Sequence, residues 1–171
     1  MGRARLTTRR LVLFALLEAI LVGLQVVMAA FTNIEAVSLL IMVYTVVFGG
    51  GVAYIIAGFV VLEMLLWGFN TWVISYCYVW AVLAILAWLF RGMESRLGWA
   101  ILSGAYGLSF GALCALVYLP IGGPAMFVAT WVAGIPFDLL HCAGNFAMAL
   151  LLFQPCRRVL TALWQRMGDQ Q

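Results

Sequence analysis

The stretch LVLFALLEAILVGLQVVMAA, residues 11–30, decides the class of fold. Glu18 is the one charged residue in it, and a helix needs about 20 mostly apolar residues to cross a bilayer. Four arginines come before it, at positions 3, 5, 9 and 10. A basic start and an apolar run also describe a signal peptide. The run is longer than the usual length of about 7–15 residues and contains an acid, which favours a retained membrane helix.

The rest of the chain has a similar composition. Of 171 residues, 67% are hydrophobic and 9% are charged, whereas soluble domains have about 45–50% and about 25%. A disordered chain would lack the aromatic and aliphatic residues that are abundant here. We therefore expect an all-α integral membrane protein with no room for a soluble domain. The sequence has no lysine and no Walker-type glycine loop, so ATP hydrolysis by this chain is not expected.

Turn residues divide the chain into six predicted helices. Glycine and proline clusters interrupt the apolar sequence for backbone reasons, most clearly at the glycine run 49–51, the polar segment 91–96 and the PIGGP segment 120–124. The predicted helices cover residues 11–30, 36–48, 52–69, 71–90, 97–119 and 125–153, and we expect them to form one compact bundle. The second is too short to span a bilayer unless it is tilted or packed inside the bundle.

The arginines predict the orientation. With six spans, the N-terminus, the segment 91–96 and the C-terminus lie on one side of the membrane. These three segments contain four, two and three arginines, which are all the basic residues of the chain. Loops rich in arginine are cytoplasmic by the positive-inside rule. Both termini are therefore predicted to be cytoplasmic, and five spans would spoil this agreement.

Polar residues on the sixth predicted helix mark a candidate site, because ionisable groups in a span usually face the bundle interior or a watery cavity. At 100° per residue, five side chains fall within an arc of roughly 80°. They are Trp131, Gly134, Asp138, His141 and Asn145. Pro136 removes a helical hydrogen bond and should loosen the helix nearby. The face suits a binding site, an interhelical hydrogen-bond cluster that fixes packing, or a metal or catalytic site, and the sequence leaves all three open.

More polar and aromatic residues are predicted on the outer half of the bundle. They are Asn33, Glu35, Glu63, Trp67, Asn70, Trp72 and Tyr76. A pocket made from them offers acceptors and rings but no fixed cation. It would favour a neutral or cationic ligand that is rich in donors and able to stack. It would disfavour a ligand recognised through pairing of its carboxylate or phosphate with arginine.

Two stripes of small residues could let another helix approach closely. Ala15, Ala19 and Gly23 follow one another at i, i+4 and i+8 on the first helix. Glu18 and Gln25 project away from this stripe, so the two faces can have separate roles. The second stripe consists of Gly107, Gly111 and Ala115. Each stripe is suited either to an ordinary contact inside the bundle or to a partner protein.

The combined pattern resembles the substrate-binding S components of energy-coupling factor (ECF) vitamin transporters. The segments that carry the resemblance are NIEAVSLL at 33–40, FG at 48–49, GFNTW at 68–72, and GIPFD at 134–138 with His141 and GN at 144–145. It implies a vitamin-type ligand bound from outside by outer-half residues and the loop between the first two helices. The absence of arginine and lysine within the predicted spans favours a cobalamin- or pyridoxine-type ligand over the acidic vitamins.

The resemblance also implies partners and a location. An S component works with a membrane T component and two ABC ATPases in the plasma membrane of a prokaryote. Its first helix carries an Ala-x-x-x-Ala surface that meets the T component, and Ala15 and Ala19 match this pattern. The chain itself would then be a non-catalytic subunit without a metal, a cofactor or a nucleic-acid partner.

Other functions remain as alternatives. Asp138 and His141 could form the acid/base pair of an intramembrane enzyme, although no third group beyond Glu63 supports them. A stand-alone secondary transporter or channel is a further alternative, but such proteins are commonly built from repeated halves, and residues 1–85 and 86–171 show no convincing repeat. A structural membrane subunit would tolerate the loss of Glu63 and Asp138. The four cysteines lack metal-binding spacing and are interpreted as small apolar residues.

Overall fold

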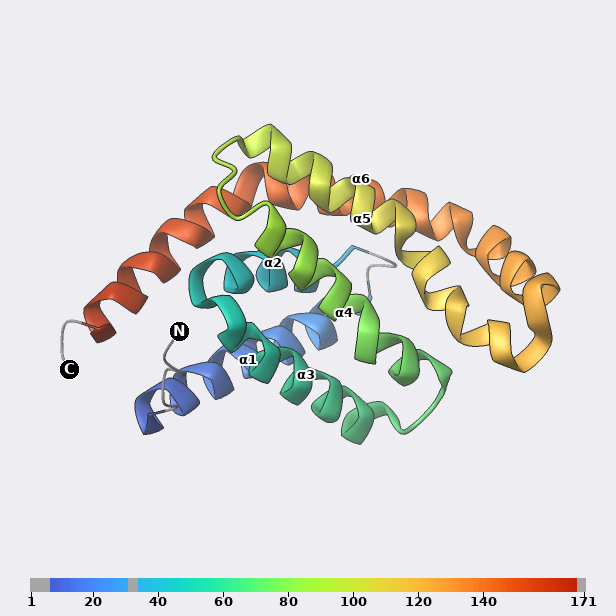
Figure 1. The fold of residues 1–171 in the computed structure, drawn as a ribbon, viewed down its shortest axis with the longest axis horizontal. Helices are drawn as coiled ribbons and strands as arrows, with labels where there is room; N and C mark the ends of the chain where they lie inside the picture. The colour runs from blue at the N-terminus through green and yellow to red at the C-terminus, as the bar shows by residue number, and fades with distance from the viewer. Residues whose placement is uncertain (1–6, 31–33, 169–171) are drawn as a thin grey trace.

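A computed structural model describes residues 7–30 and 34–168, and these residues contain helices but no strands (Figure 1). The expected all-α class is confirmed. Four helical segments are long and apolar enough to cross a membrane: Thr8–Met28, Val37–Trp67, Thr71–Leu89 and Arg96–Met167, the last of which includes a turn at Gly123. The elements are, in order, α1 (Thr8–Met28), α2 (Val37–Phe48), η1 (Gly49–Gly51), α3 (Val52–Trp67), α4 (Thr71–Leu89), α5 (Arg96–Ala115), η2 (Leu116–Tyr118) and α6 (Leu119–Gly168).

The short helix α2 lies inside the molecule. Every residue from Val37 to Thr45 is buried. A helix that is apolar on all sides belongs in a core or in lipid, since it has no polar face for water. Glu35 accepts hydrogen bonds from the Ser38 N–H (3.0 Å) and from the Ser38 hydroxyl, which satisfies a backbone donor of the first turn. The short length expected for this helix therefore agrees with a position inside the bundle.

The last helix departs from the predicted range 125–153. The chain turns at Gly123 (φ 70°, ψ −170°) and not over the whole segment 120–124, because glycine adopts a positive φ without steric cost. Helix α6 then continues beyond Phe153 to Gly168. The prediction ended the helix where the apolar run ended. The segment that follows contains arginine, leucine and glutamine, which are good helix formers whether or not they lie in lipid.

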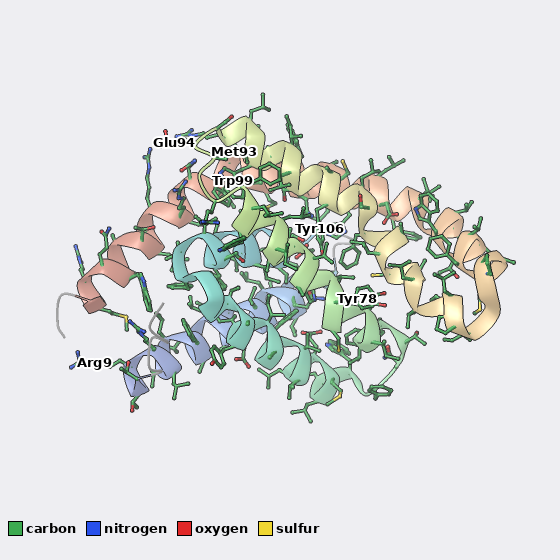
Figure 2. The ribbon with its side chains drawn as sticks, viewed as in Figure 1. Arg9, Tyr78, Met93, Glu94, Trp99 and Tyr106 are labelled. Atoms are coloured by element: carbon green, nitrogen blue, oxygen red, sulfur yellow. The ribbon has the colours of Figure 1, made fainter. Side chains whose placement is uncertain are left out.

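Successive helices run back and forth between two ends of the molecule, as Figure 1 shows. At one end, the start of α1 meets the end of α6, where the Arg10 guanidinium lies 5.1 Å from the centre of the Trp164 ring. The same ring packs edge-on against Phe48 at the end of α2 (5.1 Å). The turn between α4 and α5, in which Figure 2 labels Met93 and Glu94, is fastened to α6 by the Gln154 amide, which donates to the Glu94 carbonyl oxygen at 2.9 Å.

The outer surface carries large apolar side chains that a soluble protein would cover. Leu65 and Phe69 are 71% and 72% exposed, and many other leucines, valines and isoleucines of the described residues are similarly open. Extended apolar surface of this kind marks contact with lipid or protein. Together with the long apolar helices, this surface is consistent with a membrane location.

Glycines let α5 and α6 lie close together, side by side along most of α5 (Figure 1). A Cβ atom added to Gly107 would lie 2.8 Å from the His141 carbonyl oxygen. A Cβ atom on Gly111 would overlap the Asp138 carboxylate. The second small-residue stripe is therefore a contact inside the bundle, which is one of its two predicted roles.

Gly107→Ala should lower the midpoint of thermal unfolding in detergent by several degrees. The added methyl group meets backbone of α6 that cannot move without separating the helices, and overpacking of this kind costs about 1–3 kcal/mol. Gly23→Ala is the matched control, because a Cβ atom there has nothing within 4 Å. A midpoint unchanged by Gly107→Ala would mean that α5 and α6 are less tightly packed than the structure shows.

Candidate functional site

Two open pockets adjoin the Trp72 side chain. The first, of about 380 Å³, is lined by residues of α1, α3 and α4: Gln25, Ala29, Glu63, Trp67, Trp72 and Tyr76. The second, of about 330 Å³, lies between α4, α5 and α6 and includes Trp72, Ser75, Phe110, Gly111 and Asp138. Pockets that hold small molecules measure about 300–1,000 Å³. Five predicted binding residues thus line one or both pockets.

The start of α4 positions the aromatic wall between the pockets. Asn70 caps this helix, and its side-chain oxygen accepts a hydrogen bond from the Trp72 N–H at 3.0 Å. The predicted binding residue Asn70 is therefore placed as a helix cap and is not among the residues that line either pocket. The neighbouring Thr71 hydroxyl bonds to the Tyr118 hydroxyl (3.1 Å), which ties this end of α4 to η2.

Tyr76, which lines the first pocket, belongs to an aromatic cluster. The Tyr76 ring lies edge-on to Trp72 (5.0 Å between ring centres) and to Trp80 (5.2 Å). It also stacks on Phe59 at 6.2 Å. The Gln25 amide donates a hydrogen bond to the Tyr76 hydroxyl at 3.4 Å. Rings that are fixed from several sides keep their orientation, so the pocket offers a preformed stacking surface.

Glu63 supplies the carboxyl group of the first pocket. The residue is only 2% exposed, although it lines the pocket. Its Oε1 atom has no hydrogen-bond partner within the described part of the chain. Buried polar atoms are nearly always hydrogen-bonded, so this oxygen is available to a donor that enters the pocket.

The buried His141 and the partly buried Glu35 form a pair that joins the segment before α2 to α6. The Glu35 carboxylate lies 3.0 Å from His141 Nε2 and also accepts the two bonds from Ser38. The imidazole stands edge-on to the Phe110 ring, with 4.7 Å between ring centres. His141 Nδ1 has no partner among residues 7–30 and 34–168. The pair therefore holds the segment before α2 against α6, next to Phe110 of α5.

Asp138 belongs to the second pocket and is not bonded to His141. Its Oδ1 atom accepts a hydrogen bond from the Gly111 N–H at 2.8 Å, while Oδ2 has no partner in the described ranges. The imidazole pairs with Glu35 instead. An acid/base pair of Asp138 and His141, as an intramembrane enzyme would use, thus lacks a direct contact in this structure.

Of three other predicted binding residues, two lie away from the pockets and one lies outside the described residues. Asn145 is 1% exposed, and neither amide atom has a hydrogen-bond partner within the described part of the chain, but it lines neither pocket. Trp131 is 38% exposed and packs against Phe127 at 6.0 Å. Asn33 falls in residues 31–33, outside the described residues.

The sequence did not identify Gln25 or Phe110 as binding residues. An amide inside a predicted span was an available signal for Gln25, since polar groups in lipid normally face the interior. Phe110 is one of eleven phenylalanines, and nothing in its neighbourhood singles it out. Its position against His141 follows from the packing of α5 on α6, which the sequence does not specify.

Both pockets have the same electrostatic character. Glu63 lines the first pocket and Asp138 the second, and no arginine of the described residues lines either pocket. Such walls bind hydrogen-bond donors and positive charge, and aromatic faces add attraction for a cation. The site is thus suited to a neutral or cationic aromatic ligand.

The fold and these pockets define an all-α protein with apolar helices of membrane-spanning length and two small-molecule-sized pockets. No protein-family model, curated protein or solved structure matches the chain. The resemblance to S components therefore rests on the sequence pattern alone.

Proposed function

We propose that the chain is the substrate-binding S component of an ECF-type importer. In this proposal it spans the membrane six times with both termini in the cytoplasm. It binds a vitamin-type micronutrient from outside, and a T component with two ABC ATPases drives its release into the cell. The observation that carries the proposal is that both pockets include residues beside the α3–α4 turn. This turn lies at the end of the molecule opposite the arginine-bearing segments (Figure 1).

The orientation is supported by the contacts of the arginine-bearing segments. Arg10 at the start of α1 reaches Trp164 on α6, and Arg157 Nη1 donates to the Met93 carbonyl oxygen of the α4–α5 turn at 3.5 Å. These segments, which are far apart in sequence, gather at one end, as the positive-inside rule requires of cytoplasmic segments. The pockets at the other end would then open toward the outside.

The size and polarity of the pockets favour a small ring over a large one. A pyridoxine-type ligand is a hydroxylated pyridine, whose hydroxyl groups suit the carboxyl oxygens of Glu63 and Asp138. Its ring suits the faces of Trp72 and Tyr76. A cobalamin is far larger than either pocket and would require the two to open and merge. Of the two ligand types that the sequence suggests, the pyridoxine type is the better match.

Native mass spectrometry of the purified protein tests the proposal directly. We expect the protein, alone or after incubation with a panel of vitamins at micromolar concentration, to retain one small molecule. A pyridoxine-type adduct is expected over a cobalamin or an acidic vitamin. Protein that is shown to be folded by its thermal unfolding and that retains no member of the panel would contradict the proposed binding function.

A further inference from the structure

A third pocket lies at the arginine-bearing end, far from the two pockets described above. It has a volume of about 550 Å³ and is formed by the α4–α5 turn, the start of α5 and the C-terminal part of α6. Its lining is almost entirely polar: Glu94, Arg96, Gln154, Arg157, Arg158, Thr161, Ala162 and Gln165. Three arginines face one acid, so the pocket carries net positive charge. We refer to it as the basic pocket.

The arginines of the basic pocket form no ion pair within the described residues. Within residues 7–30 and 34–168, the one carboxylate in ion-pair contact is Glu35, and its partner is His141. Glu94 lines the basic pocket without pairing to Arg96 or Arg157. Uncompensated guanidinium groups in one concavity are the usual means by which proteins bind a phosphate, because each can donate two parallel hydrogen bonds to its oxygens.

The basic pocket is held in shape by bonds across its edge. Gln154 donates to the Glu94 carbonyl oxygen at 2.9 Å, and Arg157, which is half-buried, donates to the Met93 carbonyl oxygen at 3.5 Å. Figure 2 shows Met93 and Glu94 in the turn that these bonds fasten to α6. The 20-residue helix α5 also begins here, and the N-terminal end of a helix dipole favours an anion.

Apolar side chains directly follow the polar lining along the chain. Leu97 comes next to Arg96, and Val159 next to Arg158, and both are more than half exposed. A ligand that joins a phosphate to hydrocarbon chains would satisfy both kinds of surface. We propose that the basic pocket binds the phosphate headgroup of an anionic phospholipid, with the acyl chains running along the neighbouring apolar surface.

The location is consistent with this ligand. Arginine-rich ends of membrane proteins lie on the cytoplasmic side, where anionic lipids give the leaflet a negative surface potential and basic pockets between helices bind their headgroups. Bound lipid would link the α4–α5 turn to the C-terminal part of α6. The proposal does not depend on which small molecule enters the pockets at the other end.

Lipid titration of the full-length protein in detergent, followed by native mass spectrometry, tests the proposal. Phosphatidylglycerol and phosphatidylcholine with identical acyl chains are the probes, and inorganic phosphate is the competitor. We expect phosphatidylglycerol to bind about tenfold or more tightly than phosphatidylcholine, since only the former has net negative charge. Displacement of phosphatidylglycerol by an equal concentration of inorganic phosphate would overturn the assignment to a lipid.

Charge-removing variants distinguish binding of the lipid in the basic pocket from a general attraction of the lipid to positive charge. The triple variant Arg96→Gln, Arg157→Gln, Arg158→Gln should reduce phosphatidylglycerol affinity by about tenfold or more. The control triple variant Arg9→Gln, Arg91→Gln, Arg166→Gln removes the same charge outside the basic pocket and should change affinity by much less. Equal losses in the two triple variants would overturn the proposal. If the triple variant does not fold, the single variant Arg158→Gln replaces it in the test. Unchanged phosphatidylglycerol affinity in Arg158→Gln would also count against the basic pocket.

Discussion

Asp138→Asn should weaken binding of the small-molecule ligand by about tenfold or more, which corresponds to about 1.4 kcal/mol. The substitution keeps an oxygen that can accept the Gly111 N–H, the contact that Asp138 Oδ1 makes at 2.8 Å. It replaces the other oxygen, which has no partner in the described residues, by an amide donor. A ligand donor in the second pocket would then face a donor, and the negative charge would be lost.

The measurement is the dissociation constant of the ligand identified by mass spectrometry, determined by isothermal titration in detergent. Glu18→Gln is the matched control, because it makes the same chemical change in a helix but outside both pockets, where Glu18 contacts Gly58. The ligand affinity of the Glu18→Gln variant should stay within about twofold of that of the unchanged protein. Trp72→Ala provides a second test, since Trp72 lines both pockets. Affinity unchanged by both Asp138→Asn and Trp72→Ala would place the ligand elsewhere.

Most of the helical structure could be predicted because the apolar runs and their glycine and proline breaks are local signals. The short, uniformly apolar α2 could be recognised as a helix that is either tilted or packed inside the bundle, and the structure shows it buried. The end of α6 could not be predicted from the apolar pattern, because the helix leaves the apolar region at Phe153 and continues to Gly168. There the Trp164 ring packs on Phe14 and Phe48, a contact between segments far apart in the sequence.

The candidate site was predictable only in part. Glu35, Glu63, Asp138 and His141 stand out because polar groups are rare in apolar helices, and that signal identified them individually. The bond between Glu35 and His141 joins residues that are 106 positions apart, and it depends on how α2 packs on α6. Asn70 was predicted as a binding residue, but it stands directly before α4 and caps that helix, a local role that its position could have indicated.

The double variant Ala15→Leu, Ala19→Leu should prevent docking of a T component. Its ligand affinity should stay within about twofold of that of the unchanged protein. Both alanines are exposed on α1, and Gly23, one further turn along, has open space beside it. Small residues at this spacing let another helix come close, and larger side chains keep it away. The polar face of α1 is separate, since Gln25 reaches Tyr76 and Glu18 lies against Gly58 of α3.

The test is pull-down of a co-expressed T component with the tagged protein, together with the ligand titration described above. Ala143→Leu with Ala147→Leu is the matched control, because these alanines are also exposed and four residues apart, but on α6. Loss of docking in the α1 variant alone would assign the partner surface to the stripe of Ala15, Ala19 and Gly23. A loss of ligand affinity without a loss of docking would mean instead that this stripe lines the binding site. Equal loss of docking in both variants would mean that added bulk anywhere on the exposed apolar surface disturbs assembly, and the stripe would then have no special role.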